Sequence, residues 1–207
     1  MHTRKPASAA IKITMHFIFS ILLFSFAAAF CEEAPIEESS AVETQDALTE
    51  ECAPIPEESE PFCYFIPPKG WAMAEPNLLG PQVKMAFVKI DKKRKFCPSL
   101  NLAIEKVEGG LNAYLNDVKV IHEQDRKNHW RKLGKVHTLA GEAQLTEIDT
   151  SSHMGAVRML QLILLKEGRA YILTAAALKE DFCDFYQEFQ SAFRSLTISE
   201  KKTSLPN

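Results

Sequence analysis

The sequence predicts an α+β fold in which a largely antiparallel, seven-stranded sheet carries one helix on each face. Strand and helix patterns follow in the order three strands, a helix, four strands and a final helix, with hairpin turns and no βαβ alternation. The last two predicted strands are apolar on both faces, so each face of the sheet needs a cover. Two amphipathic helical patterns are available to cover them.

The first three predicted strands precede the first helix. The aromatic run 62–66 ends at Pro67 and Pro68, which lack the N–H that a sheet requires. Residues 84–90 form the next strand and end at the basic turn 91–95. Over 99–107 apolar and polar side chains alternate, which is typical of a strand with one buried face.

One helix and two hairpins follow. Leu111, Tyr114, Leu115 and Val118 recur at helical spacing and predict a helix over 111–123. Two pairs of strands are then expected to form hairpins around short turns, namely 131–138 with 142–150 and 157–165 with 170–178.

The final helix begins after Asp181, which is a favourable N-cap residue. Its side chains form a broad aromatic stripe that contains Phe182, Phe185, Tyr186, Phe189, Phe193 and Leu196. Such a stripe is more often part of the core than of a ligand site, so we expect it to face the sheet. The alternative is an exposed surface that binds a groove of a partner.

Residues 1–29 have the composition of a secretory signal peptide. Basic residues precede the uncharged run 17–30, which is too short to span a bilayer as a helix. Small residues end the run, and we expect cleavage between Ala29 and Phe30. A rival interpretation is lipid attachment at Cys31, which the bulky Phe30 disfavours. Membrane association is expected only if the signal remains uncleaved or Cys31 is lipidated.

Charge divides the rest of the chain into unlike parts. Residues 31–60 contain ten Glu and one Asp but no Lys or Arg, so we expect 30–60 to be a disordered acidic tether. Its alternative function is to attract a basic partner. The domain is expected over 61–199, with a polar tail over 200–207, and its mild positive charge shows no clustering of the kind that nucleic-acid binding requires.

No catalytic, cofactor-binding or metal-binding constellation is recognisable. His122 is followed by Glu123, but Arg126 occupies the position where a zinc-binding helix would place its second histidine. His153 lies near Ser152 without the G-x-S-x-G turn that presents a nucleophilic serine. We therefore expect a protein that is not an enzyme and needs no cofactor. A hydrolytic or redox site assembled from distant residues remains the alternative.

The cysteine pattern contains no C-x-x-C motif, which argues against a thioredoxin-like dithiol site. After cleavage five cysteines remain, namely Cys31, Cys52, Cys63, Cys97 and Cys183. Because Cys63 and Cys97 each lie at the start of a predicted strand, they are the best candidates for a disulfide in an oxidising compartment. Reduced, buried thiols are the alternative.

The densest basic patch lies on the turn between the second and third strands, at Lys92, Lys93, Arg94 and Lys95. A positive turn of this kind is a possible contact for an acidic partner, an anionic surface or the chain's own acidic tether. A solvated hairpin tip is the alternative interpretation.

Four short motifs resemble those of PsbP-like domains when taken in their order and spacing. They are Phe65–Trp71 (FIPPKGW), Gly141 before a strand, Gly168–Ala175 (GRAYILTA) and Ser195–Ile198 (SLTI). The resemblance covers about 62–198 and implies an α/β/α sandwich in a bacterial exported member of this family. It also implies that Trp71 packs over the sheet edge. It carries over no functional residue, and the acidic tether departs from the pattern of bacterial lipoproteins.

PsbP-like domains mostly bind or help to assemble other proteins. The resemblance and the signal peptide together predict a non-catalytic exported protein, periplasmic or secreted, whose domain binds or helps to assemble another envelope protein. A lipid-anchored structural component of the envelope is the alternative. The sequence indicates neither the partner nor the oligomeric state.

Overall fold

A computed structural model of the chain describes residues 62–199. The expected signal peptide, acidic tether and polar tail lie outside the described residues, as do Ala29, Phe30 and Cys31. Within the described part, no helix combines the length and the apolar character that crossing a membrane requires.

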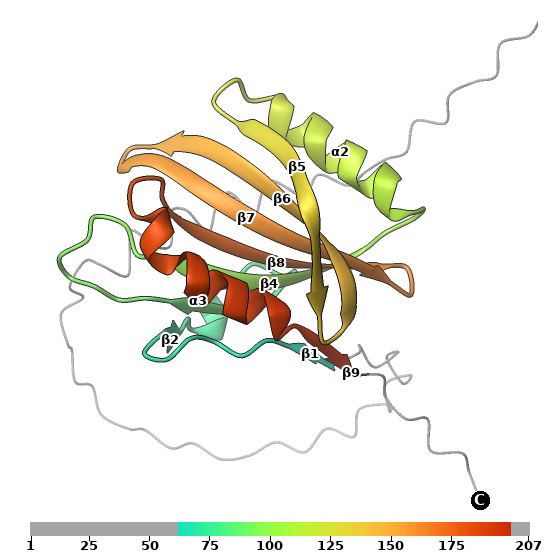
Figure 1. The fold of residues 1–207 in the computed structure, drawn as a ribbon, viewed down its shortest axis with the longest axis horizontal. Coiled ribbons are helices and arrows are strands. Elements are labelled where there is room, and N and C mark those ends of the chain that lie inside the picture. Colours follow the sequence, from blue (N-terminus) through green and yellow to red (C-terminus); the bar gives the residue numbers. More distant parts are fainter. Residues whose placement is uncertain (1–61, 200–207) are drawn as a thin grey trace, which may run out of the picture.

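Nine strands, two α-helices and a short 3-10 helix make up the described domain (Figure 1). In chain order they are β1 (Phe62–Tyr64), β2 (Ala72–Met73), η1 (Pro76–Leu78), β3 (Val83–Val88), β4 (Ser99–Lys106), α2 (Leu111–Glu123), β5 (His129–Thr138), β6 (Gly141–Ser152), β7 (Gly155–Lys166), β8 (Arg169–Leu178), α3 (Phe182–Arg194) and β9 (Thr197–Ser199).

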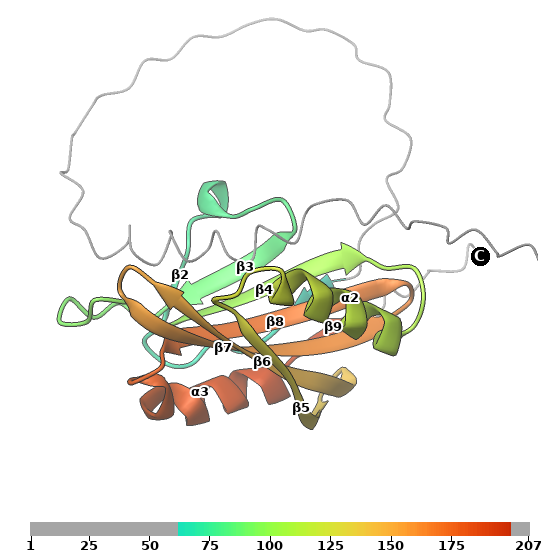
Figure 2. The ribbon, with the colours of Figure 1, turned by 90° about the horizontal axis from the view of Figure 1, so that it is seen from above.

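Seven strands form one antiparallel sheet in the order β2-β3-β4-β8-β7-β6-β5. The predicted fold class is therefore confirmed, with α3 on one side of the sheet and α2 on the other (Figure 2). One member of the sheet was predicted wrongly. β1 pairs with β9 in a separate two-stranded sheet, and β2, which was not predicted, is the seventh strand of the main sheet. Pro67 and Pro68 separate β1 from β2, so the chain leaves one sheet before it joins the other.

The hairpin between β7 and β8 forms at the predicted turn. Lys166 pairs with Arg169, and the two residues between them, Glu167 and Gly168, have φ angles of 51° and 68°. Two consecutive positive φ angles define the tight turn whose twist matches that of the flanking strands. Glycine supplies the second of these angles without steric cost, which explains why the turn forms here.

The aromatic stripe of α3 faces the sheet, as predicted. Phe182, Phe185, Phe189 and Phe193 are buried in one cluster with inward-facing side chains of β4, β7 and β8. Each large apolar side chain that is buried in this way contributes about 1.5–3 kcal/mol. Tyr186 departs from the prediction, because it is 42% exposed and lies outside the buried stripe.

Trp71, which directly precedes the edge strand β2, joins the same cluster. Its ring meets Phe185 and Phe189 edge to face, at centroid distances of 6.4 and 6.0 Å. Its indole Nε1 donates a hydrogen bond to Glu188 at 2.5 Å. The segment before β2 is thus fixed to α3 by packing and by a polar contact.

On the other face of the sheet, α2 covers one end. Tyr114, Leu115 and Val118 pack against Ile163 of β7 and against neighbouring apolar residues of β8. The Tyr114 hydroxyl donates to Glu105 Oε2 at 2.9 Å and ties α2 to β4. The two faces of β7 and β8 are therefore both used, which explains their apolar character on both sides.

A second apolar cluster lies on the α2 side, beyond the residues that α2 contacts. It joins strand residues of β6, β7 and β8 to a residue of the loop before β4, and consists of Phe96, Ile148, Val157, Met159, Ala176 and Leu178. Among the described residues, Trp130 and Met154 also pack against it. The predicted cover by helix 111–123 is therefore correct for one part of this face only.

Candidate functional site

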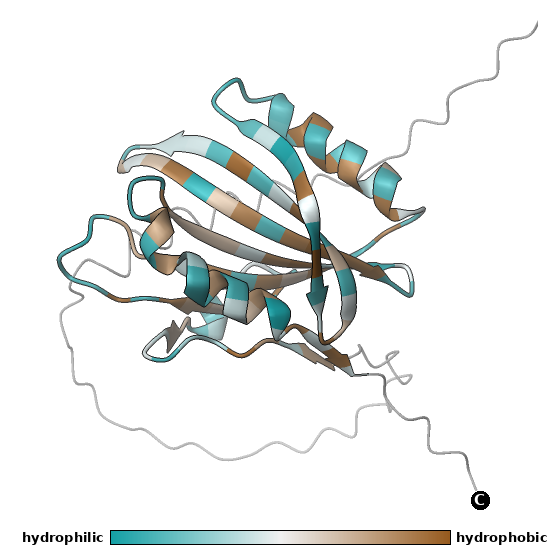
Figure 3. Cartoon of the chain, in the orientation of Figure 1, coloured by the Kyte–Doolittle hydropathy of each residue, from teal (hydrophilic) through white to brown (hydrophobic). Residues whose placement is uncertain are grey.

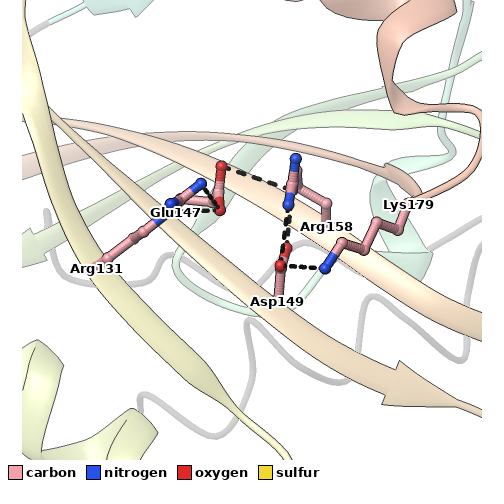
Figure 4. A network of polar contacts seen from close by, with 5 residues as sticks. All are labelled: Arg131, Glu147, Asp149, Arg158 and Lys179. Atoms are coloured by element: carbon pink, nitrogen blue, oxygen red, sulfur yellow. Dashed lines mark hydrogen bonds and ion pairs between the residues drawn. The ribbon is translucent and has the colours of Figure 1, made fainter.

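Five charged residues form a network on the α3 side of the sheet (Figure 4). They come from three neighbouring strands and the residue after β8, and they are Arg131, Glu147, Asp149, Arg158 and Lys179. Strand register brings them together, because Arg131 lies opposite Glu147 and Asp149 lies opposite Arg158. Directly opposed residues share a face and have neighbouring side chains.

Every carboxylate in this network has basic partners. Arg131 Nη2 lies 2.7 Å from Glu147 Oε1, and Arg158 Nε lies 2.8 Å from Asp149 Oδ1 and 3.5 Å from Glu147 Oε2. Lys179 Nζ lies 2.8 Å from Asp149 Oδ2. The two carboxylates therefore hold three cations in a continuous chain of ion pairs, and Glu147 is its least exposed member, with only 8% of the side chain exposed.

These contacts fix the ionisation of Asp149. Hydrogen bonds from Arg158, and then from Lys179, lower the pKa of Asp149 from 3.8 to about 2 against the opposing effect of burial. Asp149 is thus a carboxylate at neutral pH and has no proton to donate as a general acid. The Arg158 guanidinium also lies 5.8 Å from the Phe182 ring centroid, so the network extends to the first turn of α3. The arrangement joins three strands and α3 through charged contacts.

One residue of the basic turn, Arg94, directs its side chain toward α3 and makes contacts within the domain. Arg94 Nη1 lies 2.7 Å from Asp181 Oδ2, Arg94 Nη2 lies 3.3 Å from Asp184 Oδ2, and the guanidinium is 4.9 Å from the Phe185 centroid. Asp181 is the residue before α3, as predicted, but its side chain makes no capping hydrogen bond. It binds Arg94 instead. Of the four predicted partner contacts, Arg94 is engaged within the domain. The side chains of Lys92, Lys93 and Lys95 are exposed.

The structure does not form the predicted disulfide. Within residues 62–199, Cys63 is a buried thiol on β1. Cys97, which is fully buried before β4, is disulfide-bonded, but its partner is not Cys63. The prediction assumed that both cysteines start strands of one sheet. β1 belongs to the two-stranded sheet instead, and this places Cys63 in the cluster under α3.

The histidine candidates do not assemble a metal site. His122 is buried on α2, and burial lowers its pKa to about 4, so its imidazole is neutral at pH 7. Over residues 62–199 no group of three or more His, Cys, Asp or Glu side chains is arranged to hold a metal ion. Asp149, which lies near His153 in sequence, is engaged by Arg158 and Lys179.

An exposed apolar patch lies where β1 and β9 meet the C-terminal end of α3. We call it the apolar end patch, and it consists of Phe62, Tyr64, Ile66 and Leu139. Phe62, Ile66 and Leu139 are 67%, 62% and 73% exposed. Backbone contacts place its parts at one end of the molecule, because Ile66 N bonds Ser195 Oγ and Leu139 N bonds the Arg194 carbonyl. Figure 3 shows hydrophobic residues at this end of the domain.

Alternation along β1 explains how the patch forms. Cys63 points into the core, so Phe62 and Tyr64 point outward, and their rings lie 5.5 Å apart. The sequence identified this aromatic run as a strand, but it gave no indication that the outward side would remain uncovered. That outcome depends on the pairing with β9, which is only three residues long and was not predicted.

A row of buried polar side chains also escaped the sequence analysis. Asn101, Thr174 and Gln161 lie directly opposite one another on β4, β8 and β7. Each has a polar side-chain oxygen without a hydrogen-bond partner in the described structure. The polar residues within these apolar strands were the available signal, but only the register shows that they form one row.

Comparisons with known proteins concern the fold. No family model matches the sequence, and no curated protein sequence is similar to it. The solved structure of LpqN, a protein involved in cell envelope biogenesis of Mycobacterium tuberculosis, matches with a TM-score of 0.51 and 13% identity, over 70% of this chain and 87% of LpqN.

Two further solved structures match at lower TM-scores. Cyanobacterial PsbP from Synechocystis matches at 0.44 with 10% identity, over 66% of this chain and 86% of that one. The Ran-binding protein Mog1p of Saccharomyces cerevisiae matches at 0.46 with 13% identity, over 66% and 89%. At the identity seen with LpqN, what this chain shares with that protein is the fold: an antiparallel sheet with one helix on each face.

Proposed function

We propose that the chain is a non-catalytic exported protein whose domain binds or helps to assemble another protein of the cell envelope. The observation that carries this proposal is the apolar end patch. Three large apolar side chains, each more than 60% exposed, gather with Tyr64 at one end of a domain whose other aromatic residues are mostly buried. Contiguous exposed apolar surface is typical of a protein-binding site.

The charged groups support a binding role rather than a catalytic one. Glu147 and Asp149 are held by cations, and the acidic residues at the start of α3 bind Arg94. These charged side chains therefore stabilise the layers of the domain itself, whereas three of the four residues of the apolar end patch are more than 60% exposed. The fold shared with LpqN, which is involved in cell envelope biogenesis, is consistent with an envelope location.

Substitution of the patch tests the proposal. Ile66→Asp and Leu139→Asp each place a charge on the patch, and we expect them to abolish capture of the partner in pull-downs from crosslinked envelopes. Val120→Asp is the matched control, because Val120 is 50% exposed on α2, away from the patch. Capture that survives both patch variants, or the absence of any reproducible partner, would contradict a binding function at this site.

The proposal also includes export with cleavage between Ala29 and Phe30. The intact mass of protein purified from its host should correspond to a chain that begins at Phe30. A mass that includes Met1 would contradict cleavage, and an added lipid on Cys31 would favour the anchored alternative.

A further inference from the structure

Strand β5 forms an open, basic edge of the seven-stranded sheet. It is the last strand in the sheet order, and among the described strands it pairs only with β6. One row of its backbone N–H and C=O groups therefore points away from the sheet. Such an edge is a template on which another extended segment can add.

Its charge is unusual for one strand and the turn before it. Residues 126–138 contain five Lys and Arg residues and no Asp or Glu. The side chains of Arg131 and Lys135 are 61% and 60% exposed, and Lys132 is exposed as well. Arg131 and Lys135 bind Glu147 and Glu142 of the neighbouring strand β6, so these two cations lie on the β6 side of β5. Figure 3 shows hydrophilic residues along much of β5.

Positive charges and a bulge are the means by which edge strands avoid pairing with copies of themselves. β5 has both, since its register shifts between Lys132 and Lys135. The same positive charges would favour pairing of β5 with a strand that carries acidic side chains. The shift leaves two regular stretches, 129–132 and 135–138, on either side of the irregularity. An added strand would pair with each of them.

We propose that the outer edge of β5 binds the acidic segment 36–53 of the same chain, which adds to the sheet as an eighth strand. This segment contains six acidic residues and no Lys or Arg. It lies between Pro35 and Pro54 and is the longest stretch without proline in residues 30–60. Each of its residues can therefore donate a backbone hydrogen bond. Like-charge repulsion disfavours order in the isolated segment, and the cations of β5 relieve that repulsion.

The connection to the domain permits this placement. The Ala140 amide donates to the Leu196 carbonyl at 2.9 Å, directly before β9, and β9 pairs with β1. Phe62 therefore starts the domain close to the hairpin that ends β5. The eight residues 54–61 can span up to about 30 Å when extended. The C-terminal end of the segment would then meet β5 at Thr138, and the segment would run parallel to β5.

Hydrogen exchange of the mature chain tests the proposal. Amides of β5 that point away from β6 should exchange about tenfold more slowly in the parent protein than in a variant whose six acidic residues in 36–53 are replaced by Gln or Asn. Ala47→Pro, which removes a strand N–H without changing charge, should have the same effect, whereas Ser59→Pro outside the segment should not. Lys132→Glu should also abolish protection, with Lys93→Glu on the basic turn as its control.

Equal β5 exchange in the parent, the neutralised variant and Ala47→Pro would overturn the inference. Protection that increases with protein concentration would also overturn it, because it would indicate a segment from a second copy. Neither result depends on the apolar end patch, so failure here is distinguishable from failure of the proposed function.

Discussion

At the scale of single residues, the charged network makes the domain sensitive to acid. The folded state lowers the pKa of Asp149 to about 2, whereas in the unfolded chain it is near 3.8. The stabilisation is thus fully present above about pH 4 and is lost as the pH falls from about 4 to about 2. The shift corresponds to about 2 kcal/mol, and solvent screening at a partly exposed site reduces it to roughly 1–2 kcal/mol.

Asp149→Asn should therefore lower the free energy of unfolding by roughly 1–2 kcal/mol at pH 7. It should also flatten the dependence of stability on pH between about 4 and about 2. Urea midpoints measured across this range check both effects. Asp117→Asn on α2, which lies on the other side of the sheet, is the control and should keep the parent's acid sensitivity.

For the buried polar row of Asn101, Thr174 and Gln161, the expected effect of removing a polar group is the opposite. Thr174 is 2% exposed, and its hydroxyl has no hydrogen-bond partner in the described structure. Thr174→Val keeps the shape and removes the unpaired group, so it should be neutral or stabilise the domain by up to about 1 kcal/mol. Thr146 donates to the Gln161 carbonyl at 3.4 Å, and Thr146→Val should instead cost about 0.5–1.5 kcal/mol. Thermal unfolding of the two variants distinguishes these cases. A large loss of stability in Thr174→Val would show that the Thr174 hydroxyl has a hydrogen-bond partner.

At the scale of elements, α3 is held mainly by its aromatic face. Phe189 is fully buried and contacts the rings of Phe182, Phe185 and Trp71. Phe189→Ala should cost about 3–5 kcal/mol. Tyr186→Ala on the exposed side of the same helix should change stability by roughly 0.5 kcal/mol or less. A stable Phe189→Ala protein that no longer captures its partner would show that this helix face binds the partner instead of the sheet.

Elements with strong local signals were predicted well from the sequence. The spacing of Tyr114, Leu115 and Val118 identified α2, and the Glu167-Gly168 turn identified the hairpin of β7 and β8. β2 and β9 were missed because strands of two and three residues carry no readable periodicity. Their formation depends on partners that are distant in the sequence.

The candidate site was less predictable for the same reason. Arg131, Glu147 and Arg158 meet through the register of three strands, and a shift by one residue would place them on opposite faces. Arg94 was correctly placed on a basic turn, but its ion pair with Asp181 depends on the packing of that turn against α3. Sequence patterns indicated which residues are polar, whereas the fold decides which of them meet.

At the scale of the whole molecule, the two ends of the domain stabilise each other. β1 and β9 form their own sheet, and Cys63 and Ile198 face each other within it. A chain that stops after Leu196 lacks β9, so the amides of residues 62–66 should exchange about tenfold or more faster while those of β7 and β8 keep their protection. A chain that stops after Glu200 is the control. Unchanged exchange in the shorter chain would show that β1 is held by α3 alone.

The pairing of β1 with β9 also decides how the domain responds to mechanical force. Phe62 lies opposite Ser199, so a chain pulled from both ends is loaded at one end of a three-residue antiparallel ladder. Such a ladder opens like a zipper, one pair at a time, and yields at low force. The seven-stranded sheet is not in line with that load until β1 and β9 have separated. Separation of β1 from β9 would then lengthen the chain under load before force reaches the seven-stranded sheet and its core.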